Sequence, residues 1–293
     1  MKTIDQPTIL VTGSGGQLGN ELKNIAADHP GYDFIFADSK DLPIDNFTAV
    51  KNYFDLRQIN YCINCAAYTA VDKAETEKEK AFLINADAAG NLASICKEHK
   101  AQLIHISTDY VFDGTAQQPY KETDNTSPIN IYGQSKLKGE QLALQQDPTA
   151  IIIRSSWLYS SFGNNFVKTM LRLMKEKESI NVVNDQAGCP TYAAGLAKAI
   201  MQIITQLPIA NCPLPFVFNY ASTGTTNWYE FALAIKTFTK SNCTIHPITT
   251  AAFPTAAKRP QYSVLDTTKI RDTFNIDIPD WKDSLQNCLK LLK

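Results

Sequence analysis

Hydrophobic and polar positions in the first half of the chain alternate between short apolar runs and longer amphipathic stretches. The apolar runs have the length and composition of buried strands and lie at residues 8–13, 32–38, 61–68, 101–108 and 150–156. The stretches between them have helical periodicity and lie at residues 16–29, 46–58, 73–99 and 130–140. Strands that alternate with helices predict a parallel sheet covered by helices on both faces.

This alternation becomes looser after about residue 156. Amphipathic helices are predicted at residues 164–180 and 192–207, and the rest mixes helices with loops rich in proline and threonine. We therefore predict an α/β fold, a Rossmann-like doubly wound parallel sheet with a smaller C-terminal substrate-binding domain. Residues 1–155 form the dinucleotide-binding domain and 156–293 mainly the substrate-binding domain, and a strand near 216–221 returns to the sheet.

A glycine-rich turn follows the first predicted strand, in the sequence TILVTGSGGQLGNEL. Gly13, Gly16 and Gly19 lie between a strand and a helix. In dinucleotide-binding folds the first glycine permits a tight turn, the second lets the backbone approach a pyrophosphate, and the third lets helix and strand pack closely. The N–H groups at the start of the helix then face the anion. The turn therefore predicts a dinucleotide site.

The end of the second predicted strand carries an acidic residue at the expected distance from this turn. Asp38 follows Gly13 by 25 residues, close to the spacing of a carboxylate that binds the adenosine ribose. A carboxylate there favours NAD, because it repels a 2′-phosphate. Ser39 and Lys40 come next and are able to bind that phosphate. The choice between NAD and NADP stays open.

Composition and charge exclude several classes of function. The net charge of the 293 residues is −1, so no basic surplus indicates a nucleic-acid partner. No apolar stretch approaches the ~18 residues of a membrane helix, and the first residues do not resemble a signal peptide. The seven cysteines are scattered and odd in number, which is typical of a reducing compartment. These features predict a cytoplasmic protein that binds neither nucleic acid nor membrane.

A tyrosine and a lysine four residues apart lie in NIYGQSKLKGE and share one face of the predicted helix. Reduction of a ketone requires a proton at the oxygen while hydride reaches the carbon. The Lys136 ammonium and an oxidised nicotinamide are expected to lower the pKa of Tyr132 and make it a proton donor. Thr108, at the end of a strand, is placed to bind the substrate oxygen.

Together these stretches resemble the extended short-chain dehydrogenase/reductase superfamily, and more narrowly its dTDP-4-dehydrorhamnose reductase family. The resemblance follows the chain in order through seven segments, which are GSGGQLGNEL, NCAAYTAVDKAE, LIHISTDYVFDG, YGQSKLKGE, RSSWLYSSFGNNFVKTMLRL, NDQAGCPT and RPQYSVLD. It implies reduction of the C4 ketone of dTDP-4-dehydro-L-rhamnose to dTDP-L-rhamnose by NADPH or NADH. The implied partner is thus a dTDP-sugar, and a homodimer stays open.

The resemblance also implies roles for individual residues. The catalytic residues are Thr108, Tyr132 and Lys136. The cofactor-binding residues are Gly13, Gly16, Gln17, Leu18, Gly19, Asp38, Ala67, Tyr68, Thr69, Tyr132 and Lys136. The substrate-binding residues are Val71, Thr108, Asp109, Trp157 and Arg259. Trp157 would offer a flat face to a sugar ring, and Arg259 would approach the diphosphate.

Some positions depart from the family pattern. Glu21 matches one of the acidic residues through which some members dimerise around Mg²⁺, but its companions have no counterpart, so we predict no bound metal. Pro43 stands where many members have an aspartate on the adenine side. Related dehydratases have an Asp-Glu pair after the threonine, and here Tyr110 follows Asp109. An epimerase with the same three residues, or a regulatory subunit that reduces nothing, stays open.

Overall fold

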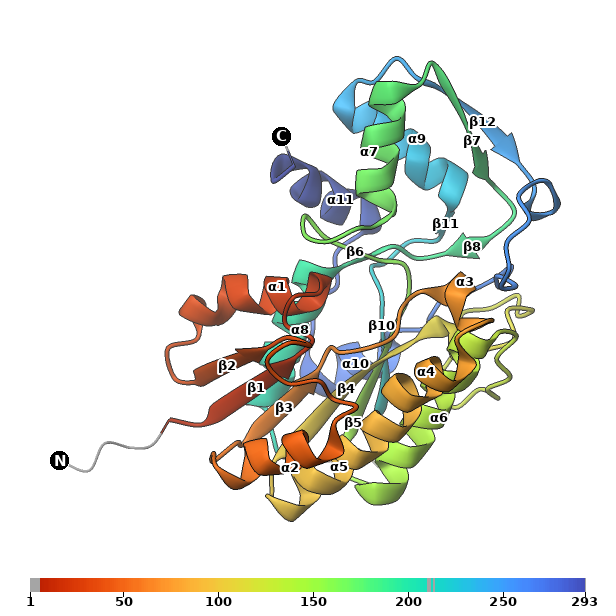
Figure 1. The fold of residues 1–293 in the computed structure, drawn as a ribbon. Coiled ribbons are helices and arrows are strands. Elements are labelled where there is room, and N and C mark those ends of the chain that lie inside the picture. The colour runs from red at the N-terminus through yellow and green to blue at the C-terminus, as the bar shows by residue number, and fades with distance from the viewer. Residues whose placement is uncertain (1–5, 210–211, 213, 293) are drawn as a thin grey trace.

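A computed structural model describes residues 6–209, 212 and 214–292 (Figure 1). Its centre is a sheet of six parallel strands in the order β10-β5-β4-β3-β1-β2. The strands are β1 (Thr8–Thr12), β2 (Asp33–Ala37), β3 (Tyr61–Asn64), β4 (Gln102–Thr108), β5 (Ile151–Ser155) and β10 (Val217–Tyr220). The order reverses between β1 and β3, and ligands of open α/β sheets bind beside such a point. The predicted doubly wound fold is confirmed.

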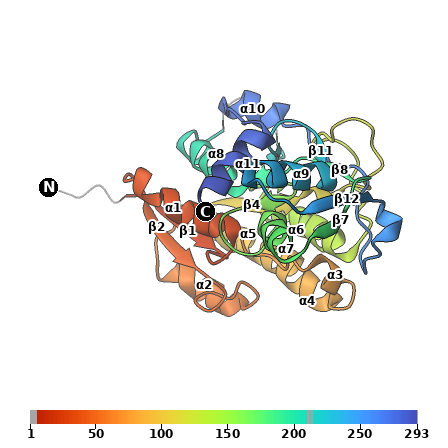
Figure 2. The ribbon, with the colours of Figure 1, turned by 90° about the horizontal axis from the view of Figure 1, so that it is seen from above.

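Helices cover both faces of this sheet and bury one apolar cluster on each. One cluster lies under α1 (Gln17–Ile25), α8 (Ala193–Thr205) and α10 (Thr268–Phe274). The other lies under α2 (Phe47–Asp55), α5 (Ala88–Glu98) and α6 (Ile131–Gln146). Figure 2 shows α8 and α10 on one side of the sheet and α2 on the other. Burial on both faces explains why the strands are almost continuously apolar.

A third apolar cluster forms a lobe above the sheet in Figure 1. Its helices are α7 (Phe166–Glu176), α9 (Trp228–Thr239) and α11 (Trp281–Lys290). The second half of the chain also contains three pairs of short strands. They are β6 (Leu158–Tyr159) with β9 (Thr191–Tyr192), β7 (Ser179–Val183) with β12 (Thr244–Ile248), and β8 (Ala187–Gly188) with β11 (Thr226–Asn227). The domain division after residue 155 stays a prediction, because β10, α8 and α10 from the second half belong to the sheet layers.

Two predicted elements are wrong in extent. The helix expected at residues 73–99 is divided into α3 (Val71–Ala74), α4 (Lys78–Phe82), a π-helical segment η2 (Leu83–Asp87) and α5. Within the π-helical segment, the side chain of Asn85 bonds the backbone N and O of Tyr68 at 2.8 and 3.0 Å. The helix expected to reach residue 180 ends at Glu176, and Ser179 begins β7. Short 3₁₀ segments complete the fold, namely η1 (Ala26–Asp28), η3 (Asp109–Val111) and η4 (Thr250–Ala252).

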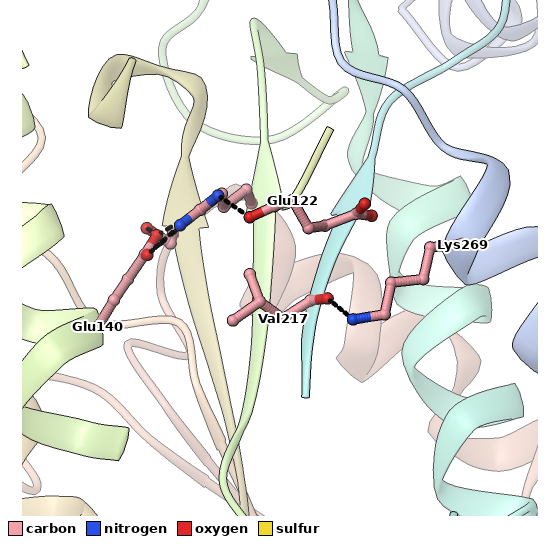
Figure 3. A network of polar contacts seen from close by, with 6 residues as sticks. Glu122, Glu140, Val217 and Lys269 are labelled. Atoms are coloured by element: carbon pink, nitrogen blue, oxygen red, sulfur yellow. Dashed lines mark hydrogen bonds and ion pairs between the residues drawn. The ribbon is translucent and has the colours of Figure 1, made fainter. Parts of the chain in front are cut away.

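The edge strand β10 has polar side chains in place of a further strand. Lys269 donates from Nζ to the Val217 carbonyl at 2.8 Å (Figure 3). The Asn219 N–H donates to Glu122 Oε1 at 2.9 Å. The Asn219 side chain donates to the Tyr120 carbonyl at 2.8 Å. These bonds satisfy backbone groups of the edge strand without a neighbouring strand.

A buried ion pair lies beside this edge and connects β5 to α6. The Arg154 guanidinium donates from Nη2 to Glu140 Oε2 at 2.7 Å and from Nε to Oε1 at 2.9 Å. Both side chains are less than a tenth exposed. Ser107 Oγ also donates to Glu140, and Arg154 Nη1 approaches the Glu122 carbonyl at 3.4 Å (Figure 3).

Within the described ranges, no helix has the length and apolar character needed to cross a membrane.

Candidate active site

The glycine turn forms a close contact between the ends of β1 and β3. Gly13 has φ of 63°, and a Cβ there would lie 2.5 Å from the backbone N of Ala66. Any other residue would be both strained and in collision. At Gly19 a Cβ would lie 2.5 Å from Ser14 Cα, so the turn packs directly on the helix. Gly16 caps α1 without a side-chain hydrogen bond, which leaves the first N–H groups of the helix available to an anion.

Asp38 follows β2 and folds back on its own loop. Its Oδ1 accepts from the backbone N–H of Lys40 at 2.7 Å and of Asp41 at 3.2 Å. These bonds, the Lys40 bond above all, lower the pKa of the carboxyl. Asp38 therefore presents a charged carboxylate beside the glycine turn. Ser39 lines the cavity as well, whereas Lys40 is not among its lining residues, and the choice between NAD and NADP stays open.

Helix α6 brings the tyrosine and lysine to the same place. The Asn130 side chain accepts from the Gly133 N–H at 2.8 Å and caps the helix. Glu75 accepts a hydrogen bond at 2.9 Å from the N–H of Ile131, the first residue of the helix. A Cβ at Gly133 would lie 2.2 Å from the Tyr110 carbonyl, so only glycine permits this approach to the segment after β4.

A cavity of about 930 Å³ lies along the carboxyl ends of β1, β3, β4 and β5. Most of the predicted site residues line it, namely Gly13, Gly16, Gln17, Leu18, Gly19, Asp38, Ala67, Thr69, Val71, Thr108, Asp109, Tyr132, Lys136 and Trp157. Tyr68 and Arg259 are not among its lining residues. One cavity therefore holds the glycine turn and all three predicted catalytic residues.

Burial is the largest influence on the pKa of Tyr132 in this cavity. Burial raises the pKa of Tyr132 to about 12, and a hydrogen bond with Thr108 opposes that shift. The Tyr110 ring packs edge-on against it, with centroids 5.5 Å apart. Lys136 is not among the causes of the shift. The prediction that Lys136 and an oxidised nicotinamide together lower the pKa of Tyr132 concerns the protein with its cofactor bound, and it stays a prediction.

Lys136 is buried at the floor of the cavity, with 2% of its surface exposed. Its Nζ donates to the Ile106 carbonyl at 2.6 Å and lies 3.5 Å from His105 Nε2. Burial lowers the pKa of Lys136 to about 8, while Glu140 and Cys65 oppose the shift. The amine is thus held in place by the backbone of β4, and its charge changes near neutral pH.

Thr108 and Asp109 form a buried pair at the end of β4. The Thr108 hydroxyl donates to Asp109 Oδ1 at 3.0 Å and accepts from the Tyr110 N–H at 3.2 Å. Burial raises the pKa of Asp109 to about 7, and hydrogen bonds with Thr108 and Ser263 oppose the shift. Asp109 is therefore a carboxyl that gains or loses its proton near neutral pH inside the cavity.

The raised pKa of Asp109 predicts a dependence of stability on pH. Between about pH 4 and pH 7 the folded protein holds a proton on Asp109 that the unfolded chain has lost. We expect this carboxyl to lower the free energy of unfolding by about 4 kcal/mol as pH rises through that window. In urea titrations at several pH values, Asp109→Asn should lack this pH-dependent contribution to the free energy of unfolding. Equal pH slopes for both proteins would contradict the assignment.

Trp157 is fixed between elements of the upper lobe. Its φ is 47°, and its ring stacks on Trp228 with centroids 3.6 Å apart. A Cβ at Gly188 would lie 2.5 Å from the Trp157 ring, so only glycine fits there. Trp228 in turn donates from Nε1 to Gln186 Oε1 at 3.1 Å. One face of the expected sugar platform is thus already covered by Trp228, which also lines the cavity.

Two predicted ligand-binding residues point elsewhere. Arg259 forms a bidentate pair with Asp72, at 2.7 Å from Nη2 and 3.1 Å from Nη1, and this pair lowers the pKa of Asp72. Arg259 thus connects the C-terminal loop to α3 rather than lining the cavity. Tyr68 is buried against α4 and η2, with its backbone bonded by Asn85.

Glu21 faces inward from α1. Its Oε1 accepts from the Ser160 hydroxyl at 2.7 Å, and burial raises its pKa. Among the residues that the structure describes, no cluster of three His, Cys, Asp or Glu side chains is arranged to bind a metal.

The sequence did not single out several residues that complete the cavity. Ser107, Ser155 and Trp228 line it, and His105 lies directly behind Lys136. Ser107 and His105 lie in the same strand as Thr108, so their proximity follows from the strand assignment. Trp228 comes from α9, and no spacing in the sequence connects it to Trp157.

This fold and this site define a short-chain dehydrogenase/reductase: a doubly wound sheet with a glycine turn after β1 and a Tyr-x-x-x-Lys helix after β4. More narrowly, residues 7–293 match the family model described as RmlD substrate binding domain. The chain belongs to this family.

Sequence relatives and solved structures agree with that family. The chain is 40% identical over 285 residues to a dTDP-4-dehydrorhamnose reductase of Aggregatibacter actinomycetemcomitans, with 95% of this chain and 97% of the relative covered. A Clostridium acetobutylicum dTDP-4-dehydrorhamnose reductase is 39% identical with a TM-score of 0.91, covering 97% and 99%. The Bacillus anthracis enzyme, solved in complex with NADP, is 38% identical with a TM-score of 0.92 and the same coverage.

Proposed function

We propose that this protein reduces the C4 ketone of dTDP-4-dehydro-L-rhamnose to dTDP-L-rhamnose, with NADPH or NADH as the reductant. The observation that carries this proposal is the single cavity that joins the glycine turn to Thr108, Tyr132 and Lys136. The full-length similarity to dTDP-4-dehydrorhamnose reductases supplies the substrate. A relative solved with NADP supports the cofactor class.

The residues around the glycine turn fit a dinucleotide. The contacts at Gly13 and Gly19 leave no room for side chains, and the uncapped start of α1 offers N–H groups to a pyrophosphate. Asp38 lies on the side where the adenosine ribose would bind. When bound, the nicotinamide supplies the hydride that reaches the carbonyl carbon.

The chain itself supplies the proton and the orientation. Tyr132 keeps its proton throughout the neutral range, because burial holds its pKa near 12, and it donates that proton to the carbonyl oxygen. Thr108 accepts the Tyr110 N–H and is positioned to bind the same oxygen. Lys136 stabilises the negative charge that develops on the Tyr132 oxygen. The ketone thereby becomes a secondary alcohol.

A coupled assay tests this function. The freshly prepared 4-keto sugar nucleotide is added to the purified protein with NADPH or with NADH, and the loss of absorbance of the reduced cofactor is followed. Consumption that depends on the keto-sugar supports the proposal and ranks the two cofactors. Protein that carries tightly bound oxidised NAD and consumes none would instead indicate an epimerase. Cofactor binding with no turnover of any sugar nucleotide would indicate a regulatory subunit.

A further inference from the structure

A chain of buried polar side chains runs beneath the cavity from β1 to α6. Thr12 Oγ1 contacts Asn64 Oδ1 at 2.7 Å, Asn64 Nδ2 contacts His105 Nδ1 at 3.0 Å, and His105 Nε2 lies 3.5 Å from Lys136 Nζ. None of the four side chains is more than 2% exposed. Buried polar groups of this kind are costly unless each has a partner, so the direction of each bond is constrained.

The direction of the Asn64 amide is fixed by a backbone donor. The Ala66 N–H points at Asn64 Oδ1 at 3.2 Å, and a backbone N–H can only donate. Oδ1 is therefore the amide atom near Ala66 and Thr12, and Nδ2 is the atom that faces the His105 ring. Because an amide nitrogen donates, His105 Nδ1 must accept.

This bond determines the tautomer of His105. Burial keeps the pKa of His105 well below its ordinary value, so the ring is neutral and has one proton. With Nδ1 as an acceptor, that proton lies on Nε2. The Nε2–H then faces Lys136 Nζ, which itself donates to the Ile106 carbonyl at 2.6 Å.

We propose that His105 is a positioning residue for Lys136, held by Asn64 in the tautomer that directs its Nε2–H at the lysine Nζ. This inference rests on the proposed function for the role of Lys136 and adds a mechanism for its placement. An N–H that faces an ammonium is unfavourable, whereas an uncharged amine accepts it and completes the chain. His105 thus restricts the place of Nζ and eases release of its proton, while the ammonium that acts on Tyr132 remains the main form at neutral pH.

The other groups that face Lys136 act in the opposite direction. Glu140, one helical turn further along α6, favours the ammonium, and so does Cys65 at the end of β3. Glu140 is mostly engaged by Arg154, which reduces its influence on the lysine. Tyr132, one helical turn earlier in α6, contributes a neutral phenol. Through its contact with Nζ, His105 in β4 therefore disfavours the positive charge on Lys136.

Nitrogen-15 NMR of the histidine rings tests the tautomer directly in the cofactor-free protein. The chain has four histidines, and loss of a signal in His105→Phe assigns the ring. We expect the Nε2–H tautomer for His105, with no protonation as pH falls to about 5. His29, His99 and His246 serve as internal references. An Nδ1–H tautomer, or a ring that titrates at its ordinary pKa, would overturn the proposal whether or not the protein reduces a sugar.

Three substitutions separate positioning from structure. His105→Asn keeps an acceptor for Asn64 but has no donor toward Lys136, His105→Phe has neither, and His105→Gln retains an amide donor near the Nε2 position. Without that donor, we expect kcat to fall about 10- to 100-fold, as for misplaced catalytic groups. On the alkaline side of the pH profile, kcat/KM should also fall at a higher pH than in wild type, because the ammonium form of Lys136 becomes more stable.

His105→Gln should retain most of the wild-type kcat and the wild-type alkaline limb of kcat/KM. His246→Phe is the matched control, because His246 is exposed. Cofactor affinity, followed by NADPH fluorescence over the same pH range, gives a second readout that needs no substrate. If His105→Asn and His105→Phe keep the wild-type rate and limb, His105 does not position Lys136. If wild type turns over no keto-sugar while its NMR shows the Nε2–H tautomer, the proposed function fails and the tautomer assignment stands.

Discussion

Tyr132→Phe is expected to lower kcat by about 10²–10⁴-fold, the usual contribution of a positioned general acid. The substitution removes one oxygen and keeps the ring that packs edge-on against Tyr110 at 5.5 Å. Cofactor affinity should therefore change little, and the free energy of unfolding should stay close to that of wild type. Steady-state kinetics with saturating NADPH, together with a fluorescence titration of the cofactor, measure both quantities.

Tyr110→Phe is the matched control for this experiment. It removes the same atom from the neighbouring ring, which is also buried and also has a raised pKa. Its hydroxyl is not assigned to the proton path, so the loss of rate should be much smaller. Tyr132 would have no part in proton transfer if Tyr132→Phe kept the wild-type kcat, or if Tyr110→Phe lost as much activity.

Arg154→Met is expected to destabilise the fold by about 3–5 kcal/mol, because it leaves a buried carboxylate without its partner. Glu140 is 3% exposed and accepts three bonds from the guanidinium, at 2.7, 2.9 and 3.2 Å. The remaining donor, the Ser107 hydroxyl, does not neutralise a charge. Urea denaturation followed by circular dichroism measures the loss, and the double variant Arg154→Met/Glu140→Leu should lose less than Arg154→Met alone.

Arg172→Met provides the comparison at the surface. Arg172 and Glu176 lie at the same 2.7 Å separation, but their side chains are 59% and 50% exposed. Such pairs contribute about 0–1 kcal/mol, because water already solvates both charges. Equal losses for the two single variants would show that burial does not govern the Arg154 pair.

The sequence was sufficient to predict the elements that form the cofactor turn and the sheet. Strands buried on both faces are almost continuously apolar, and the apolar cores of β1 (Ile9–Val11) and β5 (Ile151–Ile153) follow that rule. Gly13 is predictable because its backbone conformation excludes other residues, and the structure gives it φ of 63°. The spacing of Tyr132 and Lys136 on one helix then placed both in the cavity.

Features that depend on contacts between distant segments were beyond such patterns. The direction of the Tyr132 pKa shift depends on how far α6 is buried, and no spacing reports that depth. Trp228 reaches Trp157 because α9 folds over the sheet. Arg259 pairs with Asp72 because the C-terminal loop passes beside α3. The π-helical segment η2 likewise contains a contact between distant segments, the bonds of the Asn85 side chain with the backbone of Tyr68.

The side chains along β10 also bear on how copies of the protein meet in a crowded cell. An unprotected outer strand is a template on which a second polypeptide can add and begin a fibril or a domain swap. Here the Val217 carbonyl and the Asn219 N–H are already engaged by Lys269 and Glu122. An incoming chain would have to displace both charged groups before it paired, so this border of the sheet resists recruitment into aggregates.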